Sequence, residues 1–546
     1  MLPRPGPGPG PRRRREILSA AARRLDAARE PWLVARYARL GGDDARLAEV
    51  LEPAVEMAAR RAPAEALDLL LADPAPPTPE RLMRRFRVAL LARDMDVAEA
   101  TLARLRRSEN ASPADLAEAE GELAFRRGQT LTAIASYEAA AAALGHPLPR
   151  GLRGVFHDIR ALWQIRRRRL PEPRPDPRLG RVLGALYDLQ FNHDNGWLLR
   201  LHRLWLRAAP DDPRALATEV LWRQLLGLTE ASRELERALA DRFDERRDPV
   251  GAGVVLLHRA IAALLRGEVA AAFSDSIDAA TGLLRAGDPY AAALATTVPA
   301  VCGIHVAGAG SLARVRLGLD NLVEATGDER ARRWAVGIDA VARWQAGDVQ
   351  GAMDRAWDWA EGARQRQDAS EALARRFLAE LYLERGDWRS AAAELQQAAE
   401  VGRRLHVRMD YVEARVIDEL IAAAQARLAG ERLASRRSAL LRRARRLVQR
   451  SPRWEPRLLV SEGWLAMADG HEPIAHDRFE QAHAVARARD QLVDAWWALH
   501  HRALASGDEA HRTAAERFAL QHNLRSGEES LGEVPACPFP LAVEQS

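Results

Sequence analysis

The residues best suited to metal chemistry lie near the C-terminus. Residues 471–476 read HEPIAH and combine two histidines with a glutamate, the residue types of a zinc-protease helix. That chemistry needs the histidines four positions apart on one helical face, with the glutamate between them as the base. Here His471 and His476 are five positions apart, and Pro473 interrupts the segment. We therefore expect exposed or capping histidines and no metal site.

A second candidate is residues 301–313, VCGIHVAGAGSLA, which look like a strand followed by a GxGxxA phosphate-binding loop. The dinucleotide fingerprint requires a βαβ unit and an acidic residue about twenty positions further on. Gly308 and Ala313 also fit a helical repeat that recurs along the chain. We therefore expect no bound cofactor.

Lysine is absent from the chain, so all 81 basic residues are arginines. This excludes a P-loop lysine, a Schiff-base lysine and a kinase lysine. Cys302 and Cys537 lie far apart and offer neither metal-ligand spacing nor a disulfide framework. Because no nucleophile, acid/base pair or metal cluster stands out, we predict a protein that is not an enzyme.

Basic charge is concentrated in three segments, residues 1–15, 160–181 and 432–457, although the net charge of the chain is only +5. The remainder is acidic, which indicates an acidic scaffold with three basic patches. Residues 432–450 form the most informative patch, because their leucines fall on one face of a helix and arginines fill the rest. The arginine face is either solvated and paired with acidic neighbours, or it binds an acidic protein or nucleic acid. The candidate partner-binding residues are Arg436, Arg442, Arg443, Arg446 and Arg450.

Residues 371–405 show the structural unit that positions the candidate residues, a pair of helices. Apolar residues recur at intervals of three and four before and after the turn at Gly386-Asp387, which predicts two amphipathic helices. Neither helix can bury its apolar face alone, so the hairpin needs neighbours of its own kind. The pattern resembles a tetratricopeptide (TPR) repeat.

Turn glycines repeat the pattern at intervals of 37 to 44 residues. They are Gly227, Gly267, Gly308, Gly347, Gly386, Gly430, Gly470 and Gly507. Sustained self-similarity of this kind predicts an all-α, TPR-like α-solenoid of antiparallel helix hairpins with a period of about 40 residues. A small residue five positions after a turn glycine allows the two helices of a hairpin to approach closely. The predicted repeat-packing residues are Ala133, Ala272, Ala313, Ala352, Ala391 and Ala475.

Composition divides the chain into five parts. We predict a disordered Pro/Gly/Arg tail at 1–15, a helical repeat segment at 16–169 and the main solenoid at 179–525. A Pro-rich linker or bend at 170–178 separates the two, because proline cannot donate a backbone hydrogen bond and disfavours helix in its predecessor. A flexible tail follows at 526–546. No apolar run approaches the ~18–20 residues needed to span a bilayer, and no secretory signal is present, so we predict a cytoplasmic protein without a membrane partner.

The segment Arg12–Leu91, which includes VARYARLGGDDARLAEVLEPAVEMAARRAPAEALDLL, resembles the region after the ATPase module in bacterial signalling ATPases of the MalT-like and kinase-fused class. The resemblance implies a TPR-like sensory arm that binds an inducer or a partner. The chain departs from that class because it has no Walker A motif, no kinase signature and no obvious DNA-binding helix-turn-helix.

The first functional hypothesis is a non-enzymatic scaffold or regulatory arm in bacterial signalling. Its partner would be a protein such as an ATPase, a kinase or a transcription factor. The alternative is a nucleic-acid-associated repeat protein that places its arginine patches on phosphates.

Overall fold

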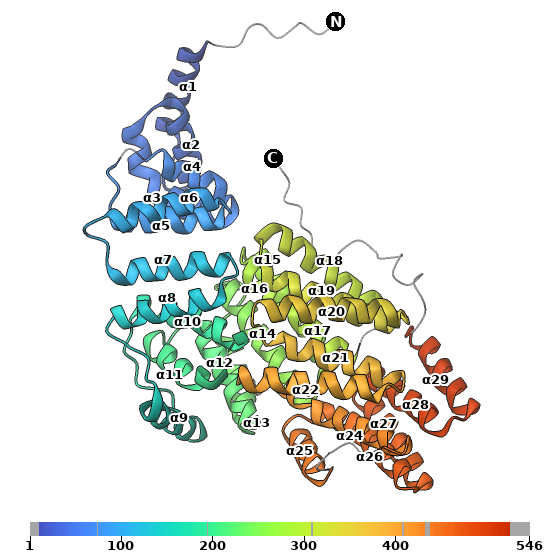
Figure 1. Cartoon of the computed structure of the whole chain (residues 1–546). Helices are drawn as coiled ribbons and strands as arrows, with labels where there is room; N and C mark the ends of the chain where they lie inside the picture. Colours follow the sequence, from blue (N-terminus) through green and yellow to red (C-terminus); the bar gives the residue numbers. More distant parts are fainter. Residues whose placement is uncertain are drawn as a thin grey trace, which may run out of the picture. The chain divides into compact units, whose positions relative to one another are not determined.

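The structure is a computed structural model, and it describes residues 10–73, 75–193, 195–306, 309–406, 409–431 and 437–524. All regular secondary structure in these ranges is helical, so the all-α prediction is confirmed. The chain divides into two compact units, residues 1–147 and 148–546 (Figure 1). Gly308, Arg436 and most of the two predicted tails lie outside the described residues.

The first unit contains eight helices among its described residues, and neighbours in the chain pack as antiparallel pairs. Their bounds are α1 (Pro11–Arg24), α2 (Pro31–Gly41), α3 (Asp44–Arg61), α4 (Pro63–Leu71), α5 (Pro79–Leu91), α6 (Met95–Arg107), α7 (Pro113–Arg126) and α8 (Thr130–Ala143).

The helix starts in this unit follow from short-range chemistry. Several helices begin with a proline at the first position, where no backbone N–H is needed. The Asp94 carboxylate accepts a hydrogen bond from the Val97 N–H at 3.0 Å and thereby caps α6. Proline also explains a correction: α1 begins at Pro11, five residues before the helix start that the sequence predicted, so part of the predicted tail is helical.

The second unit repeats the hairpin along the rest of the described chain. Its helices are α9 (Gly151–Arg166), α10 (Pro177–His193), α11 (Leu198–Ala208), α12 (Pro213–Leu225), α13 (Thr229–Arg242), α14 (Pro249–Arg266), α15 (Val269–Arg285), α16 (Pro289–Ala295), α17 (Thr297–Gly303), α18 (Ala309–Thr326), α19 (Glu329–Ala346), α20 (Val349–Gln365), α21 (Ser370–Glu384), α22 (Trp388–Arg404), α23 (Asp410–Glu413), α24 (Arg415–Leu428), α25 (Arg437–Arg450), α26 (Glu455–Ala468), α27 (Glu472–Ala488), α28 (Leu492–Ser506) and α29 (Glu509–Gln521), with 3₁₀ turns η1 (Asn195–Trp197) and η2 (Pro452–Trp454).

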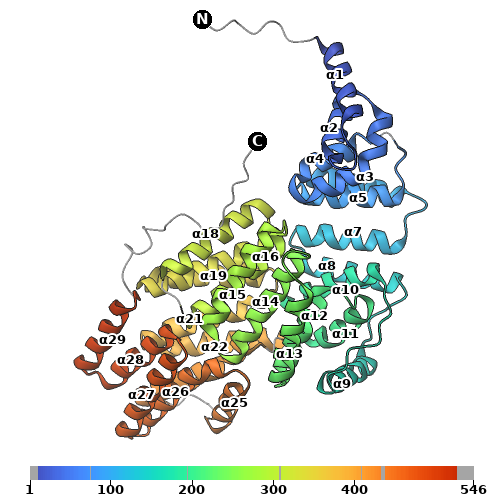
Figure 2. The same ribbon diagram turned by 180° about the vertical axis from the view of Figure 1, so that it is seen from behind.

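Each described turn glycine joins the two helices of a hairpin. Gly386 lies in the turn after α21 and has a φ of +73°. Gly470 lies in the turn after α26 and has a φ of +79°. A side chain in this left-handed conformation meets steric resistance that glycine avoids, which is why glycine marks the repeat. Successive hairpins stack side by side, which confirms the TPR-like solenoid (Figure 2).

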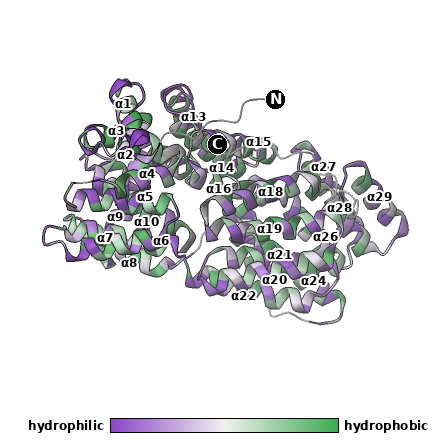
Figure 3. Ribbon diagram, turned by 90° about the horizontal axis from the view of Figure 1, so that it is seen from above, coloured by the Kyte–Doolittle hydropathy of each residue, from purple (hydrophilic) through white to green (hydrophobic). Residues whose placement is uncertain are grey.

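The two helices of a hairpin differ in their environments. In α21 every residue except Tyr382 and Glu384 is buried, whereas its partner α22 buries only one face, which includes Ala391 and Leu395. Along the helices, hydrophilic and hydrophobic residues alternate accordingly (Figure 3). The first helices of the hairpins therefore line the interior of the unit, and the second helices form its outer surface.

The interior is closed by contacts between residues far apart in the sequence. The Val493 N–H donates a hydrogen bond to the His305 carbonyl oxygen at 3.0 Å. Gly267 packs so closely on Pro452 and Arg453 that an added Cβ would lie 3.1 Å from the Arg453 nitrogen. The inner surface of the array is thus filled by its own side chains along this stretch.

The proline-rich segment 170–178 lies inside the second unit, and the two units divide after residue 147 instead. Its backbone is held by α11, because the Arg174 N–H donates to the Arg207 carbonyl oxygen at 2.8 Å and the Asp176 N–H donates to the Ala208 carbonyl oxygen at 2.9 Å. The prolines therefore form an ordered bend that leads into α10.

One helix among the described residues, α14, is long and apolar enough to cross a membrane, with a mean hydropathy of 1.4 over 18 residues. Half of it is buried, and it packs against α12 and α15. These contacts are those of a core helix in the array.

Two glycine-to-alanine substitutions test how closely the hairpins are packed. A Cβ at Gly463 in α26 would lie 2.9 Å from the ring of Phe479, which is buried, whereas a Cβ at Gly282 in α15 would meet nothing within 4 Å. We expect Gly463→Ala to lower the free energy of unfolding by about 1–3 kcal/mol because of overpacking. The control Gly282→Ala should raise it by roughly 0.5–1 kcal/mol, because alanine favours helix. Urea denaturation of both variants measures this difference, and equal effects would contradict it.

Candidate functional site

The arginine-rich helix predicted from the sequence is present as α25, Arg437–Arg450. It is anchored by Ala444 and Leu447, which are buried, and it packs against α24, α26 and η2. The opposite side of the helix is exposed and carries Arg442, Arg443, Arg445, Arg446 and Arg450, here called the arginine face. Of the predicted partner-binding residues, Arg436 lies outside the described residues, and the other four lie on this face.

Acidic neighbours pair with the margins of α25. The Arg445 Nη2 lies 2.9 Å from the Glu462 Oε1, and Arg450 pairs with Glu413. At the start of the helix the Arg437 Nη2 lies 2.6 Å from the Asp469 Oδ2, and this hydrogen bond lowers the pKa of Asp469. These pairs are solvated, which is the first of the alternatives that the sequence left open.

Three arginines of the arginine face differ from their neighbours. No ion pair among the described residues involves Arg442, Arg443 or Arg446, although Arg443 lies close enough to Glu419 to favour the charged form of that carboxyl. An exposed guanidinium group with an unused fork of N–H donors binds carboxylate or phosphate in two-pronged geometry.

The predicted repeat-packing alanines lie mainly in the interior. Ala133, Ala272, Ala352, Ala391 and Ala475 are fully buried. Ala313 is only half-buried, and the adjacent Leu312 takes the buried position in α18. The register of that repeat is thus shifted by one residue relative to the sequence pattern.

The two motifs that suggested chemistry are helical here. Val301 to Gly303 form the end of α17 instead of a strand, so the context of a dinucleotide loop is missing at that position. Pro473 lies in the first turn of α27, and His471 is its N-cap residue. Within the ranges that the structure covers, no group of three or more His, Cys, Asp or Glu side chains is arranged to hold a metal ion.

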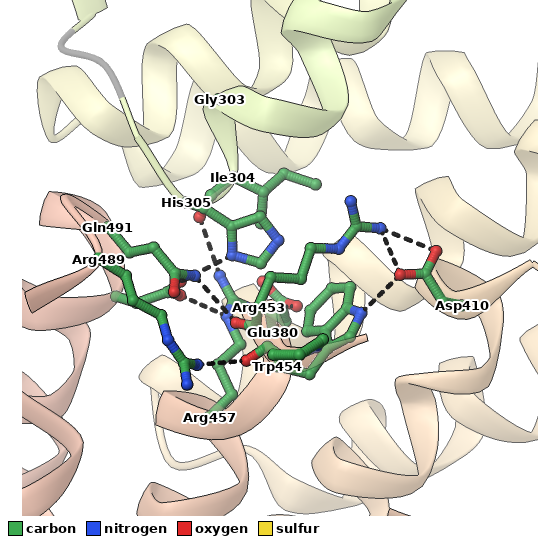
Figure 4. A network of polar contacts seen from close by, with 12 residues as sticks. Gly303, Ile304, His305, Glu380, Asp410, Arg453, Trp454, Arg457, Arg489 and Gln491 are labelled. Atoms are coloured by element: carbon green, nitrogen blue, oxygen red, sulfur yellow. Dashed lines mark hydrogen bonds and ion pairs between the residues drawn. The ribbon is translucent and has the colours of Figure 1, made fainter. Parts of the chain in front are cut away.

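The structure also reveals a cluster that the sequence analysis missed. We call it the buried ion network, and it consists of Arg376, Glu380, Asp418, Arg457, Asp494 and His305. Figure 4 labels three of its members, His305, Glu380 and Arg457. Charged residues embedded in the apolar stretches of the first helices were its only sequence signal.

Arg457 is the centre of the buried ion network. Its Nε donates to the Asp494 Oδ1 at 2.7 Å and its Nη1 to the Glu380 Oε1 at 2.5 Å. Its Nη2 donates to the Ile304 carbonyl oxygen at 3.0 Å. One guanidinium group thus ties α26 to α28, α21 and the end of α17. Burial alone would lower the pKa of Arg457, but the two carboxylates outweigh it and raise the pKa.

The remaining members extend the network on both sides. The His305 Nδ1 lies 2.7 Å from the Asp494 Oδ2, and burial lowers the pKa of His305 although Asp494 favours its charged form. The Arg376 Nε donates to the Asp418 Oδ2 at 2.7 Å. Burial raises the pKa of Asp418 to about 7 despite that contact.

Trp454 fills the space between the cations. Its buried ring lies beneath the guanidinium groups of Arg376, Arg453 and Arg457, with the Arg376 carbon 4.5 Å from the ring centre. Its Nε1–H donates to the Asp410 Oδ2 at 3.1 Å. Because the side chains of the buried ion network are at most 2% exposed, no substrate can reach them, and their role is structural.

No family model and no curated protein matches the sequence. The chain is similar to a chain of the APC/C hetero-tetramer Cut9–Hcn1 over 93% of its own length and 92% of that chain, with 14% identity and a TM-score of 0.42. A Rap protein complexed with competence and sporulation factor aligns over 84% and 100%, with 12% identity and a TM-score of 0.28. A signal transduction ATPase with a tetratricopeptide repeat sensor, from Pyrococcus horikoshii, aligns over 94% and 72%, with 11% identity and a TM-score of 0.26. With TM-scores below 0.5, the likeness says nothing about ligands or partners.

Paired substitutions separate the buried network from the surface ion pairs. Arg457→Met keeps an unbranched side chain but removes the cation that Glu380 and Asp494 share, which leaves Glu380 with Arg376 alone and Asp494 with His305 and Gln491. Because one buried partner is lost, we expect a decrease of about 3–5 kcal/mol in the free energy of unfolding. Arg445→Met removes an exposed pair and should cost about 0–1 kcal/mol. Urea denaturation followed by tryptophan fluorescence reports on both. Similar small losses in the two variants would show that the network does not hold the interior together.

Proposed function

We propose that the chain is a non-enzymatic helical-repeat scaffold, a regulatory arm in bacterial signalling that binds a partner protein in the cytoplasm. The observation that carries the proposal is the arginine face of α25, where Arg442, Arg443 and Arg446 are exposed and have no ion-pair partner among the described residues. Ala444 and Leu447 fix the opposite side of the helix in the array, so the arginines are presented on a rigid support.

The filled interior supports an outer binding surface. The first helices are buried on all sides near the buried ion network, which leaves the second helices to meet other molecules. An acidic patch on a protein matches the arginine face in charge, and such complementarity steers association and fixes register. The resemblance to signalling ATPases favours an ATPase, a kinase or a transcription factor as the partner.

Nucleic acid is the second candidate, because the same arginines could neutralise phosphates. Single-stranded nucleic acid is bound by aromatic side chains that stack on bases beside the basic groups. Helix α25 carries no aromatic residue, and Trp454, which follows it, is buried. This placement favours a protein partner.

Charge reversal on α25 tests the proposal. In the full chain, R442E/R443E/R446E should lose a cytosolic partner that the wild type captures, and affinity for that purified partner should fall by at least about tenfold. The matched control R237E/R246E/R247E makes the same change in net charge at exposed arginines of α13 and the turn after it. It should retain the partner.

The outcomes of this experiment are distinct. Retention of every partner by R442E/R443E/R446E would mean that the arginine face is merely solvated. Tight binding of a DNA duplex would support the nucleic-acid alternative. The logarithm of the association constant should then fall linearly with the logarithm of the salt concentration, with a slope of about −0.9 for each phosphate that is neutralised. Far-UV circular dichroism must show unchanged helicity in both variants.

A further inference from the structure

Helix α9, Gly151–Arg166, has two apolar sides. On one side it is attached to the array through Gly154, Ala161 and Ile165, which are buried. The same side is fixed by an ion pair in which the Arg200 Nε donates to the Asp158 Oδ1 at 3.0 Å. α9 packs chiefly against α11 and α12. These contacts hold α9 in the array without using the opposite side of the helix.

The other side of α9 is apolar and exposed. Leu152 is 88% exposed, Phe156 78%, Ile159 59% and Trp163 49%, and Val155 lies beside them. At 3.6 residues per turn, these four residues occupy an arc of about 60° that points away from the buried side. Contiguous exposed apolar groups of this kind mark interaction sites, unlike single exposed leucines. We call Leu152, Phe156, Ile159 and Trp163 the α9 seam.

The spacing of the α9 seam is that of a coiled-coil helix. Its residues are separated by four, three and four positions, which is the a/d pattern of a heptad repeat. A helix with this pattern packs against another helix by inserting its side chains between those of its partner. Within the described residues of the second unit, α9 packs chiefly against α11 and α12, and the residues on its outward side are exposed.

Arginines flank the α9 seam on one side at heptad spacing. Arg153, Arg160 and Arg167 are exposed and take the e positions, next to the a/d seam. No described carboxylate forms an ion pair with any of them, and Arg167 lies over the Trp163 ring at 5.1 Å. The g positions on the other flank are Val155 and Leu162. Charges at e and g select the partner helix and its orientation.

We infer that the α9 seam docks an amphipathic helix of another protein that carries leucine-like residues at a and d and acidic residues along the edge facing Arg153, Arg160 and Arg167. Charge complementarity argues against a second copy. In an antiparallel pair the arginines of the two helices would face one another, and in a parallel pair they would face Val155 and Leu162 and find no acidic partner. A bilayer has no heptad register, so it would not require basic residues on one flank only. The inference rests on the proposed function, because both assume that the partner is a protein. The α9 seam is nevertheless a different site from the arginine face of α25.

The test uses the full chain and two synthetic probes of about three heptads, both with leucine at a and d. One peptide carries glutamate at e and g, and the other carries arginine there. By fluorescence anisotropy, the wild type should bind the acidic peptide at least about tenfold more tightly than the basic one. R153E/R160E/R167E should reverse this preference, and F156S/I159S should lose both peptides. Because these residues are exposed, circular dichroism should show unchanged helicity.

The α25 variant R442E/R443E/R446E keeps the two proposals apart, because it should bind the acidic peptide as the wild type does. Loss of the peptide in that variant, or failure of R153E/R160E/R167E to reverse the preference, would overturn the assignment to α9. So would a wild-type dimer that F156S/I159S converts to monomer, which would make a second copy the occupant. Binding to vesicles with about one-third anionic lipid that depends on Phe156 and Ile159, without peptide binding, would make a membrane the occupant.

Discussion

The guanidinium group of Arg457 ties together elements of the second unit that lie far apart in the chain. It is completely buried, so its charge and its N–H groups must be satisfied by protein atoms. Glu380, Asp494 and the Ile304 carbonyl oxygen satisfy it, and they come from α21, α28 and the turn after α17. These partners are far apart in the chain, so they meet only when the hairpins that carry them are packed together. The network thereby links these hairpins within the second unit.

This constraint bears on the binding surfaces that we propose. An open solenoid presents its concave face to ligands, but here buried residues of α21, α24 and α26 fill the interior. Binding then depends on helices that are attached by one side and exposed on the other. Helix α25 presents arginines in this way, and α9 presents an apolar seam edged by arginines. Both rely on a rigid array to hold their exposed sides in place.

Local chemistry explains which features were predictable from the sequence. The hairpins were predictable because a turn with positive φ selects glycine, as at Gly386 and Gly470, and because amphipathic spacing is visible over one helix. The exposed arginines of α25 followed from the same spacing. The α9 seam carries the same kind of signal in Leu152, Phe156, Ile159 and Trp163, but only the structure shows that this side of the helix is uncovered. The buried ion network was not predictable, because His305 and Asp494 are separated by 189 positions.

Native-state hydrogen exchange tests most directly whether the buried ion network holds these elements together. Residues 297–306 comprise only α17 and the turn after it. If this short segment were held only by its own helical hydrogen bonds, it would unfold locally at a low free energy and its amides would exchange rapidly. Because Arg457 ties it to α21 and α26, the amides of α17, α21 and α26 should exchange with one common opening free energy and respond together to added denaturant. Exchange of residues 297–306 through a separate, low-energy opening, while α21 and α26 stay protected, would contradict the account.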